Sequence, residues 1–314
     1  MSRALGLVLG VAADAVVGDP RRGHPVAIFG SWAAAVERRL HADARTAGAA
    51  FTAVTLAPVL VGGVAIERLT RRHGFAHTLA TAAVTWACLG ARSLAHEGHV
   101  MADRLVAGDL DAAREQLPHL CGRSPEGLAA DELGRATVES LAENTNDAVV
   151  STLAWGVVAG IPGMAIHRAV NTLDAMVGYR NDRYARFGTA SARFDDVLGW
   201  LPARLTGAVA CAVAPLVGGD RRRAVTTMLR DAADHPSPNG GWCEAAWAGA
   251  LGIRLGGANT YGSRIEVRGT LGDTDWPRPD GPAVRRAASL VTAVSVATTV
   301  LAAASATLTT RRSR

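Results

Sequence analysis

Long apolar runs alternate along this chain with segments that are rich in charge. The clearest run, Ala287–Thr310, has 24 residues and no charge, and pairs of arginines flank it on both sides. At about 1.5 Å per residue, a helix of this length crosses the ~30 Å hydrocarbon core of a bilayer. We therefore predict a C-terminal membrane helix, whose orientation the symmetric arginines leave open.

Three other runs are shorter. Ala49–Ile66 and Gly74–Ala91 are near spanning length, and the short basic segment Glu67–His73 joins them. This arrangement favours a helical hairpin in the membrane, the alternative being a hairpin buried in a soluble core. Leu205–Gly219 has only 15 residues and is a marginal span.

A further run, Ala148–Ile166, is interrupted by Gly160-Ile161-Pro162-Gly163. Glycine and proline break regular helices, so this tetrapeptide predicts the turn of an antiparallel hairpin. In such a hairpin Asp147 and Asp174 lie at nearly the same level, each roughly 15–20 Å from the turn. One site that contains both carboxylates requires the chain to enter the membrane and return, so we predict a re-entrant hairpin.

The remaining chain is polar and carries helical periodicity, Gly/Pro-rich loops and no strand pattern of useful length. Its segments are 18–48, 92–147, 167–204 and 220–286. We therefore expect a mainly α-helical, polytopic membrane protein with about four to five apolar segments and large polar loops. We expect these elements to form a single domain over residues 1–314.

Composition narrows the chemistry. All 33 basic residues are arginine, which excludes a Schiff-base lysine and the lysine of a phosphate-binding P-loop. Any phosphate must therefore be held by arginines, backbone N–H groups or metal ions. The net charge of +5 is spread along the chain and no nucleic-acid module is recognisable, so we expect no nucleic-acid partner. The four cysteines are far apart, without the spacing of a metal cluster or disulfide framework.

Acidic residues recur at helical spacing just before the interrupted run. Glu139, Glu143 and Asp147 are spaced i, i+4 and i+8, so they share one face of a helix. Beyond the break, Asn171 and Asp174 share a face of the next helix, and the predicted hairpin places them opposite Asp147. Close carboxylates repel one another, so such a face is stable only when it is solvated or neutralised.

We interpret these acidic groups as a Mg²⁺ site that carries phosphate, because this hard ion takes carboxylates together with substrate oxygens. We expect Glu143, Asp147 and Asp174 to be the metal ligands. Another carboxylate pair, Asp195-Asp196, follows a loop that is rich in arginine. The alternative is a solvated acidic face, or one that neighbouring arginines neutralise.

Two constrained polar loops contain further candidates. Gly18–Val26 carries Asp19 and His24 among its prolines, and His235–Gly241 carries Asn239 beside glycines that let the backbone approach a ligand. The histidine of each loop has no second histidine at ligand spacing, so we expect hydrogen bonding to substrate rather than metal binding. The alternative for each loop is an ordinary turn.

Seven motifs follow one another in a fixed order: GDPRRGHPV, the GR near 122, RATVESLAENTND, HRAVNTLDAMVGYRN, the FG…AR.DDV run, PARLT, and HPSPNGG…EAAWAGALG.RLGG. Together they resemble the CobD/CbiB family of cobalamin-biosynthesis proteins over roughly residues 4–275. The resemblance implies a polytopic membrane enzyme, adenosylcobinamide-phosphate synthase. Its substrates would be adenosylcobyric acid and aminopropanol or (R)-1-aminopropan-2-ol O-phosphate, with the corrinoid as substrate rather than cofactor.

This reaction joins a carboxylate to an amine, which is uphill in water. We therefore expect ATP activation, with Mg²⁺ on the phosphates and a base for the ammonium. The expected catalytic residues are Glu139, Glu143, Asp147, Asp174 and Asp196, with Glu139 or Asp196 as the base. The expected residues for binding phosphate or substrate are Asp19, His24, Asn171, Arg180, Arg183, Arg193 and Asn239.

Two other functions stay open on sequence alone. One is a membrane sensor or transport component without ligase activity. The other is a Mg²⁺-dependent membrane phosphotransferase, although its usual paired Asp-rich motifs are absent. For the ligase we expect a multi-pass protein of the cell membrane, in contact with the lipid bilayer, with its active site facing the cytoplasm. Contact with other cobalamin-pathway enzymes is a further possibility.

Overall fold

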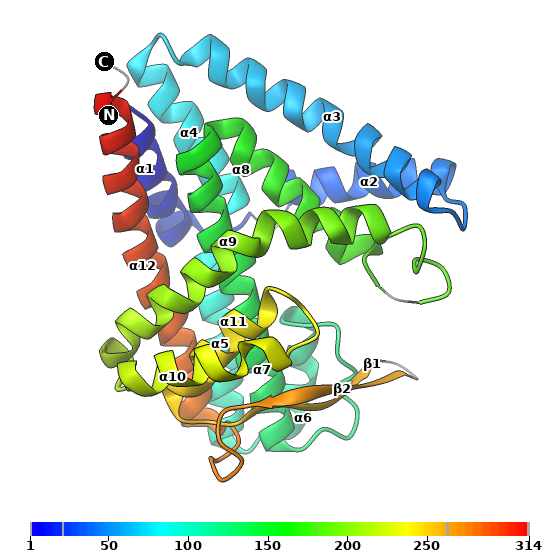
Figure 1. Ribbon diagram of the computed structural model, residues 1–314, viewed down its shortest axis with the longest axis vertical. Coiled ribbons are helices and arrows are strands. Elements are labelled where there is room, and N and C mark those ends of the chain that lie inside the picture. Colours follow the sequence, from blue (N-terminus) through cyan, green and yellow to red (C-terminus); the bar gives the residue numbers. More distant parts are fainter. Residues whose placement is uncertain (1, 21, 180, 262–263, 313–314) are drawn as a thin grey trace. The chain divides into compact units, whose positions relative to one another are not determined.

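The computed structural model describes residues 2–20, 22–179, 181–261 and 264–312 and is mainly helical (Figure 1). The chain divides into two compact units. Unit 1 contains residues 1–90, 147–199 and 299–314, and unit 2 contains residues 91–146 and 200–298. Both units are discontinuous in sequence, and the expectation of a single domain over residues 1–314 stays a prediction.

Unit 1 is built on helices that pack through small residues and aromatic rings. Its helices are α1 (Ser2–Val17), α2 (Pro25–Leu40), α3 (Arg45–Thr70), α4 (Gly74–Cys88), α8 (Ser151–Val177) and the beginning of α9 (Thr189–Val213). Gly6 and Gly10 of α1 lie against Thr81 and Thr85 of α4 so closely that a Cβ on either glycine would clash. These glycines therefore let α1 and α4 pack along their lengths, as small residues do in membrane helices.

The helix α8 folds back on itself at Gly160. This residue has φ 65° and ψ −146°, a conformation that favours glycine. In a straight helix the side chains of Asp147 and Asn171 would be about 36 Å apart, yet the Asn171 amide donates a hydrogen bond of 3.1 Å to Asp147. The predicted antiparallel hairpin is therefore confirmed, while its re-entry into a bilayer stays a prediction.

The tip of this hairpin is held by charge. The backbone N–H of Ile161 donates to Glu67 Oε2 at 3.1 Å, and Arg3 pairs with the other oxygen of Glu67 at 2.7 Å. Glu67 thereby caps the second limb of α8, where backbone N–H groups have no intrahelical acceptor.

Unit 2 combines helices with one β-hairpin. Its elements are α5 (Ala91–Ala107), α6 (Leu110–Gln116), α7 (Ala130–Thr145), the rest of α9, α10 (Arg221–Asp231), α11 (Gly240–Leu251), β1 (Leu255–Tyr261), β2 (Arg264–Leu271) and most of α12 (Gly281–Arg312).

The expectation that the chain has no useful strand is wrong, because β1 and β2 form an antiparallel pair. The register shifts between Leu255 and Gly257, which marks a bulge. Gly256 and Gly257 leave this strand without the alternation of apolar and polar residues on which recognition of a strand depends. Its position instead depends on a distant carboxylate, because Gly256 N–H donates to Glu139 at 2.7 Å.

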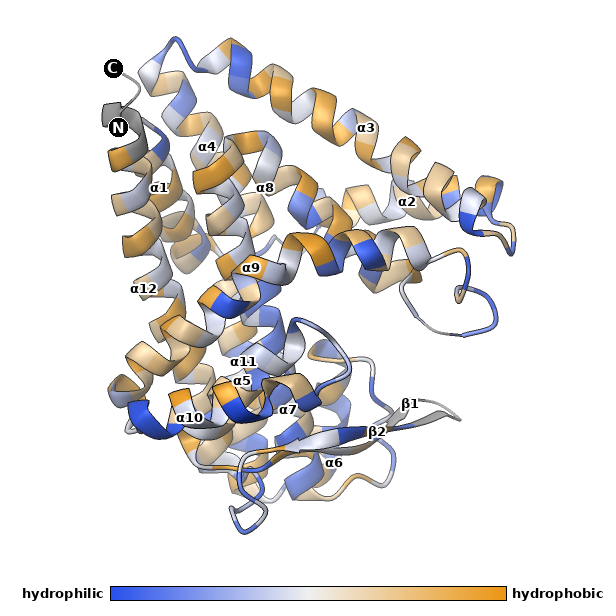
Figure 2. Cartoon of the chain, viewed as in Figure 1, coloured by the Kyte–Doolittle hydropathy of each residue, from blue (hydrophilic) through white to orange (hydrophobic). Residues whose placement is uncertain are grey.

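Within the described residues, four helical stretches are long and apolar enough to cross a membrane, by length and composition: Arg45–Thr70, Ala130–Val177, Thr189–Val217 and Gly281–Leu308. Figure 2 shows hydrophobic residues along most of α3. The prediction of a mainly helical, polytopic membrane protein is confirmed. Residues 205–217 of the predicted marginal span belong to a longer apolar stretch, whereas α4 has only 15 residues.

Candidate functional site

Four carboxylates gather in unit 1 and form what we call the acidic cluster. They belong to Asp147, Asp174, Asp195 and Asp196. Asn171 joins two of them, because its side chain hydrogen-bonds to both Asp147 and Asp195. Each of the four aspartates is half-buried, so their mutual repulsion is only partly screened by water.

Three local features place these side chains. Asp147 lies in a π-helical turn, Asn146–Val150, a rare geometry that often occurs at functional sites. The fold-back at Gly160 brings Asn171 and Asp174 opposite it. Asp195 and Asp196 come from the first turns of α9.

A guanidinium borders the acidic cluster. Arg168 Nη1 donates to Asn171 Oδ1 at 3.2 Å, one helical turn away. Its Nε is buried and has no hydrogen-bond partner among the described residues. The donor set of carboxylate and amide oxygens suits a hard cation such as Mg²⁺.

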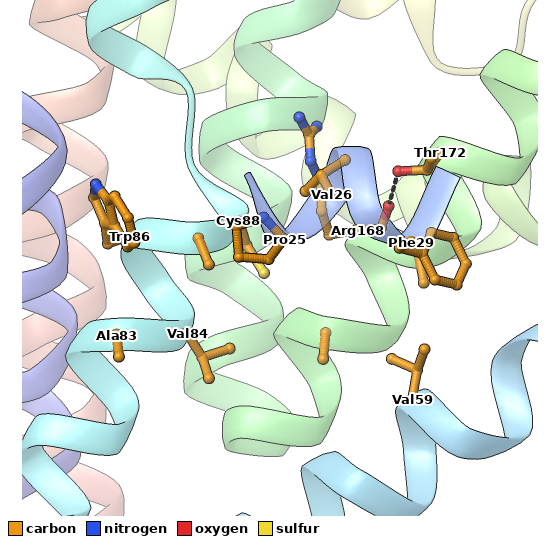
Figure 3. A pocket seen from close by; sticks show the side chains of 13 residues that line it. Pro25, Val26, Phe29, Val59, Ala83, Val84, Trp86, Cys88, Arg168 and Thr172 are labelled. Atoms are coloured by element: carbon orange, nitrogen blue, oxygen red, sulfur yellow. Dashed lines mark hydrogen bonds between the residues drawn. The ribbon is translucent and has the colours of Figure 1, made fainter. Parts of the chain in front are cut away.

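Arg168 also lines an apolar cavity of about 450 Å³ within unit 1. Figure 3 shows Phe29 of α2, Val59 of α3 and Val84 of α4 around it, and the Thr172 hydroxyl hydrogen-bonded to the backbone of Arg168. This volume suits a small or drug-sized ligand. The contacts from Arg168 through Asn171 to Asp147 link the cavity to the acidic cluster.

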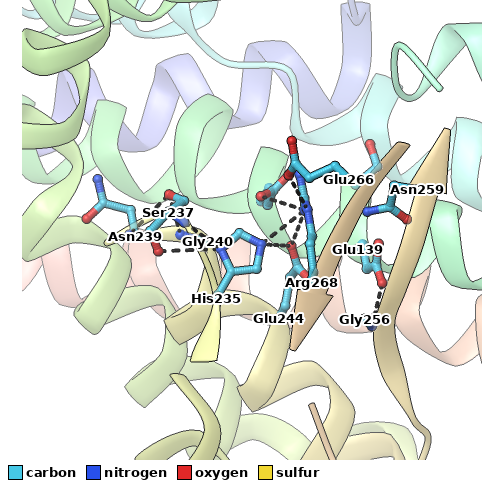
Figure 4. A network of polar contacts seen from close by, with 12 residues as sticks. Glu139, His235, Ser237, Asn239, Gly240, Glu244, Gly256, Asn259, Glu266 and Arg268 are labelled. Atoms are coloured by element: carbon cyan, nitrogen blue, oxygen red, sulfur yellow. Dashed lines mark hydrogen bonds and ion pairs between the residues drawn. The ribbon is translucent and has the colours of Figure 1, made fainter. Parts of the chain in front are cut away.

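A second polar site occupies unit 2 and consists of Glu143 of α7, Glu244 of α11 and His235, which precedes α11. We call it the Glu-His-Glu triad, and Figure 4 shows its His235 and Glu244. One ligand atom from each residue lies within 4.8 Å of the others. His235 Nε2 is 3.2 Å from Glu244 Oε1, and the ring Nδ1 accepts from the backbone N–H of Ser237 at 3.0 Å.

Arg268 of β2 reaches into this triad. Its Nη1 lies 3.0 Å from His235 Nε2 and 3.5 Å from Glu244 Oε1, and its Nε pairs with Glu266 at 3.1 Å. Burial by itself would lower the pKa of His235. The hydrogen bond to Glu244 and the charges of Glu244 and Glu143 outweigh burial and raise this pKa overall.

Glu139 pairs with arginines in the interior of unit 2. It is 1% exposed and forms ion pairs with Arg123 and with Arg135, the second at 3.4 Å. Arg135 also donates to Asn259 Oδ1 at 2.6 Å, which ties β1 to α7. This geometry corresponds to the alternative of carboxylates neutralised by arginine and gives no support to Glu139 as a base.

The expected metal ligands fall into different units. Asp147 and Asp174 belong to the acidic cluster of unit 1, whereas Glu143 belongs to the triad of unit 2. That these three residues hold one metal ion stays a prediction.

The expected phosphate-binding arginines differ in their surroundings. Arg183 pairs with Glu37 at 2.9 Å, Arg193 is exposed two residues before Asp195, and Arg180 lies outside the described residues. The charges of Arg183 and Glu37 thus already balance each other. Arg193 is the member of the three that shares a helix with the acidic cluster.

The loop candidates have local structural contacts. His24 caps α2 by accepting from Val26 N–H at 3.2 Å, and its Nε2 lies 3.5 Å from Asp19. Asn239 accepts from Arg204 at 3.4 Å. Arg204 in turn lies over the rings of Trp200 and Trp242, at 4.1 and 4.8 Å from their centroids. These contacts are structural, and a substrate role for either loop stays a prediction.

Sequence reasoning did not assign a role to Asp195, Arg168, Glu244 or Arg268. One signal was available for Glu244, which is the single charged residue of the apolar helix α11. A similar signal was available for Arg168, which is the first charged residue after the apolar run of the hairpin. Arg268 gives no such signal, since it lies on a strand that the pattern does not predict.

Fold and sites together define a polytopic helical membrane protein with acidic polar sites in both of its units. A family model described as CobD/Cbib protein matches residues 7–291, and the chain belongs to this family. The chain is 46% identical over 301 residues to the cobalamin biosynthesis protein CobD of Mycobacterium tuberculosis, covering 96% of this chain and 95% of that protein.

Other relatives give the same picture. The proteins of that name from Pelobacter propionicus and Rhodobacter capsulatus are 41% and 39% identical, covering 96% and 89% of this chain and 95% and 90% of their own lengths. No solved structure matches the chain.

Proposed function

We propose that this protein is an enzyme of cobalamin biosynthesis that forms an amide bond. It would join aminopropanol or its O-phosphate to a propionate carboxylate of adenosylcobyric acid, giving adenosylcobinamide or its phosphate. Family membership over most of the chain and the names of its relatives support the pathway. The chemistry rests on the sites.

The observation that carries the proposal is the contact between Asp147 and Asn171 across the hairpin, which assembles the acidic cluster. A carboxylate is a poor acyl donor, so its oxygen must first become a leaving group. ATP supplies that activation as phosphoryl transfer, and such transfer depends on positioning and on neutralising phosphate charge.

The acidic cluster fits Mg²⁺, since its side-chain donors are carboxylate and amide oxygens. Asp147 and Asp174 would hold the ion, with Asp195 beside them and Asn171 fixing the orientation of Asp147. Asp196 would accept the proton of the attacking ammonium. Arg168 and Arg193 would contribute positive charge toward the phosphates, in place of a P-loop lysine.

The corrinoid would be a substrate and would not be held through an axial side chain. It is too large for the 450 Å³ cavity of unit 1, which suits a much smaller group such as aminopropanol or its phosphate. In this proposal the protein lies in the cell membrane with the acidic cluster facing the cytoplasm, where ATP is available.

An assay of the purified full-length protein in detergent tests the proposal. With adenosylcobyric acid, aminopropanol O-phosphate and Mg-ATP, we expect adenosylcobinamide phosphate, detected by mass, together with cleavage of ATP. Omitting ATP or Mg²⁺ should stop product formation. A sensor or transport component would leave all substrates unchanged, and a phosphotransferase would move phosphate without forming the amide. Either result would overturn the ligase proposal.

A further inference from the structure

The Glu-His-Glu triad has the geometry of a metal site. Glu143 comes from α7, His235 from the loop between α10 and α11, and Glu244 from α11. The fold of unit 2, rather than the local sequence, therefore brings the three side chains together. At metal–ligand distances near 2.1 Å, tetrahedral donor atoms lie about 3.4 Å apart. His235 Nε2 and Glu244 Oε1 are already 3.2 Å apart.

One oxygen of the triad lacks any donor. Glu244 is 0% exposed, and its Oε2 has no hydrogen-bond partner among the described residues. The carboxyl of Glu143 is within hydrogen-bonding reach of Glu244. A buried carboxylate oxygen without a donor is costly, and two facing carboxylates need a proton or a cation between them.

From these observations we propose that Glu143, His235 and Glu244 bind a divalent transition-metal ion. One imidazole nitrogen with two carboxylates is a softer donor set than the all-oxygen sites that Mg²⁺ and Ca²⁺ prefer, and it suits Zn²⁺ or Mn²⁺. Three protein ligands leave a coordination position open for water or a substrate oxygen. This site is additional to the acidic cluster and does not depend on the proposed ligase reaction.

The surroundings of the triad fit this assignment. Because Nδ1 accepts from Ser237 N–H at 3.0 Å, metal binding through Nε2 requires His235 to move its ring proton from Nε2 to Nδ1, which also lies 3.4 Å from the carbonyl oxygen of Ser237. Such an outer hydrogen bond fixes the ring of most metal-bound histidines. The Glu143 side chain is 37% exposed, whereas those of His235 and Glu244 are almost fully buried, so the ion reaches the site from the side of Glu143.

Arg268 is the competing cation. Its guanidinium lies within 4.0 Å of Glu143, Glu244 and His235, so it occupies part of the space in which a metal ion would be bound. Glu266 offers it another partner on the same strand. Metal binding therefore requires Arg268 to withdraw from the triad toward Glu266, and the two cations should compete.

Zinc binding to the full-length protein in detergent tests the site. After treatment with a chelator and titration with Zn²⁺, we expect one ion per chain, measured by elemental analysis, and a visible d–d spectrum when Co²⁺ replaces it. Glu244→Gln should weaken Zn²⁺ binding by at least about tenfold. The matched control is Glu97→Gln, which removes a glutamate that contacts His119 elsewhere in unit 2 and should leave binding unchanged.

Arg268→Gln is expected to increase Zn²⁺ affinity, and a misfolded variant would not show such an increase. Removing the competing guanidinium should strengthen Zn²⁺ binding, by about tenfold if the two cations share their ligands. Absence of stoichiometric zinc at micromolar concentrations would overturn the proposal, as would equal affinity of Glu244→Gln and the wild type. Zinc binding that Arg268→Gln does not strengthen would place the ion elsewhere. If Glu244→Gln fails to fold, the Arg268→Gln titration decides.

Discussion

Asp147 is the residue at which the hairpin and the acidic cluster meet. Its carboxylate accepts from Asn171 across the fold-back, and it interacts electrostatically with Asp195. An asparagine in its place would keep the shape of the side chain but would remove one negative charge from the proposed Mg²⁺ site.

We expect Asp147→Asn to reduce amide formation by about 100-fold or more, because it weakens charge stabilisation around the phosphates. The measurement is product formation by the purified variant, with its membrane insertion checked by fractionation. The control is Asp131→Asn, which changes an aspartate of α7 whose side chain is 46% exposed and pairs with Arg278. Normal product formation by correctly inserted Asp147→Asn would remove the metal role of this residue.

Glu139 belongs to a different kind of site. It neutralises Arg123 and Arg135 in the interior of unit 2 and accepts from Gly256 N–H. Removal of one partner from a buried ion pair leaves an uncompensated charge, which is more costly than the pair is stabilising.

We expect Glu139→Gln to lower the free energy of unfolding by about 3–5 kcal/mol. Thermal unfolding in detergent measures the loss, and Glu115→Gln, at an exposed position of α6, should change stability by less than about 0.5 kcal/mol. A Glu139→Gln protein of normal stability that lacks activity would instead indicate a chemical role.

At the scale of elements, the hairpin of α8 depends on Gly160. Its φ of 65° and ψ of −146° are costly for any other residue, and a Cβ there would lie 2.7 Å from both Arg3 Nη2 and Glu67 Oε2. Gly160 therefore makes possible both the fold-back of α8 and the contacts of Arg3 and Glu67 that cap the second limb.

We expect Gly160→Ala to destabilise the protein by about 2–3 kcal/mol, through backbone strain and loss of the Glu67 cap, and to lower activity by separating Asp147 from Asn171. Unfolding and product formation are measured together. Gly62→Ala is the matched control, since a Cβ there meets nothing within 4 Å and alanine favours the helix. Equal stability of the two variants would show that Gly160 tolerates a side chain.

The sequence predicts elements well where the signal is local. Gly160-Ile161-Pro162-Gly163 breaks a helix in any context, and its position predicts which polar residues face one another across the hairpin. The β1–β2 pair lacks such a signal because β1 is rich in glycine and is fixed by Glu139. The π-helical turn at Asp147 likewise depends on packing rather than on residue type.

Prediction of the candidate site is limited for the same reason. Asp147, Asn171 and Asp174 could be grouped because one hairpin carries all of them. The partners of Glu143 could not, since His235 and Glu244 are about 90–100 residues away and reach it only through the fold of unit 2. That the face from Glu139 to Asp147 serves one site stays a prediction.

At the scale of the whole molecule, the contacts of α3 with α8 indicate how deep the hairpin would lie in a membrane. Gly48 packs against Phe187, beyond the acidic end of α8, whereas Gly63 packs against Pro162 at its tip. These glycines are about 22 Å apart along α3. The hairpin from Asp147 to Gly160 is about 20 Å deep, which is less than the ~30 Å core of a bilayer.

We therefore expect the segment after α8 and the turn between α3 and α4 to lie on opposite faces of the membrane. In a protein whose four native cysteines, all free thiols, are replaced, Asp182→Cys and His73→Cys should react with an impermeant maleimide from opposite sides of sealed vesicles. Both positions are exposed. Labelling of both from one side would mean that α3 does not cross the bilayer.

The order of the segments along the chain affects how the protein is made. Unit 1 takes its first helices from residues 1–90 but its last segment from residues 299–314. During synthesis the early helices are therefore in the translocon or the lipid before the last segment of unit 1 exists. The surfaces that contact this segment stay uncovered until more than 200 further residues have emerged. A truncation within α12 should consequently expose the oldest part of the chain to membrane proteases.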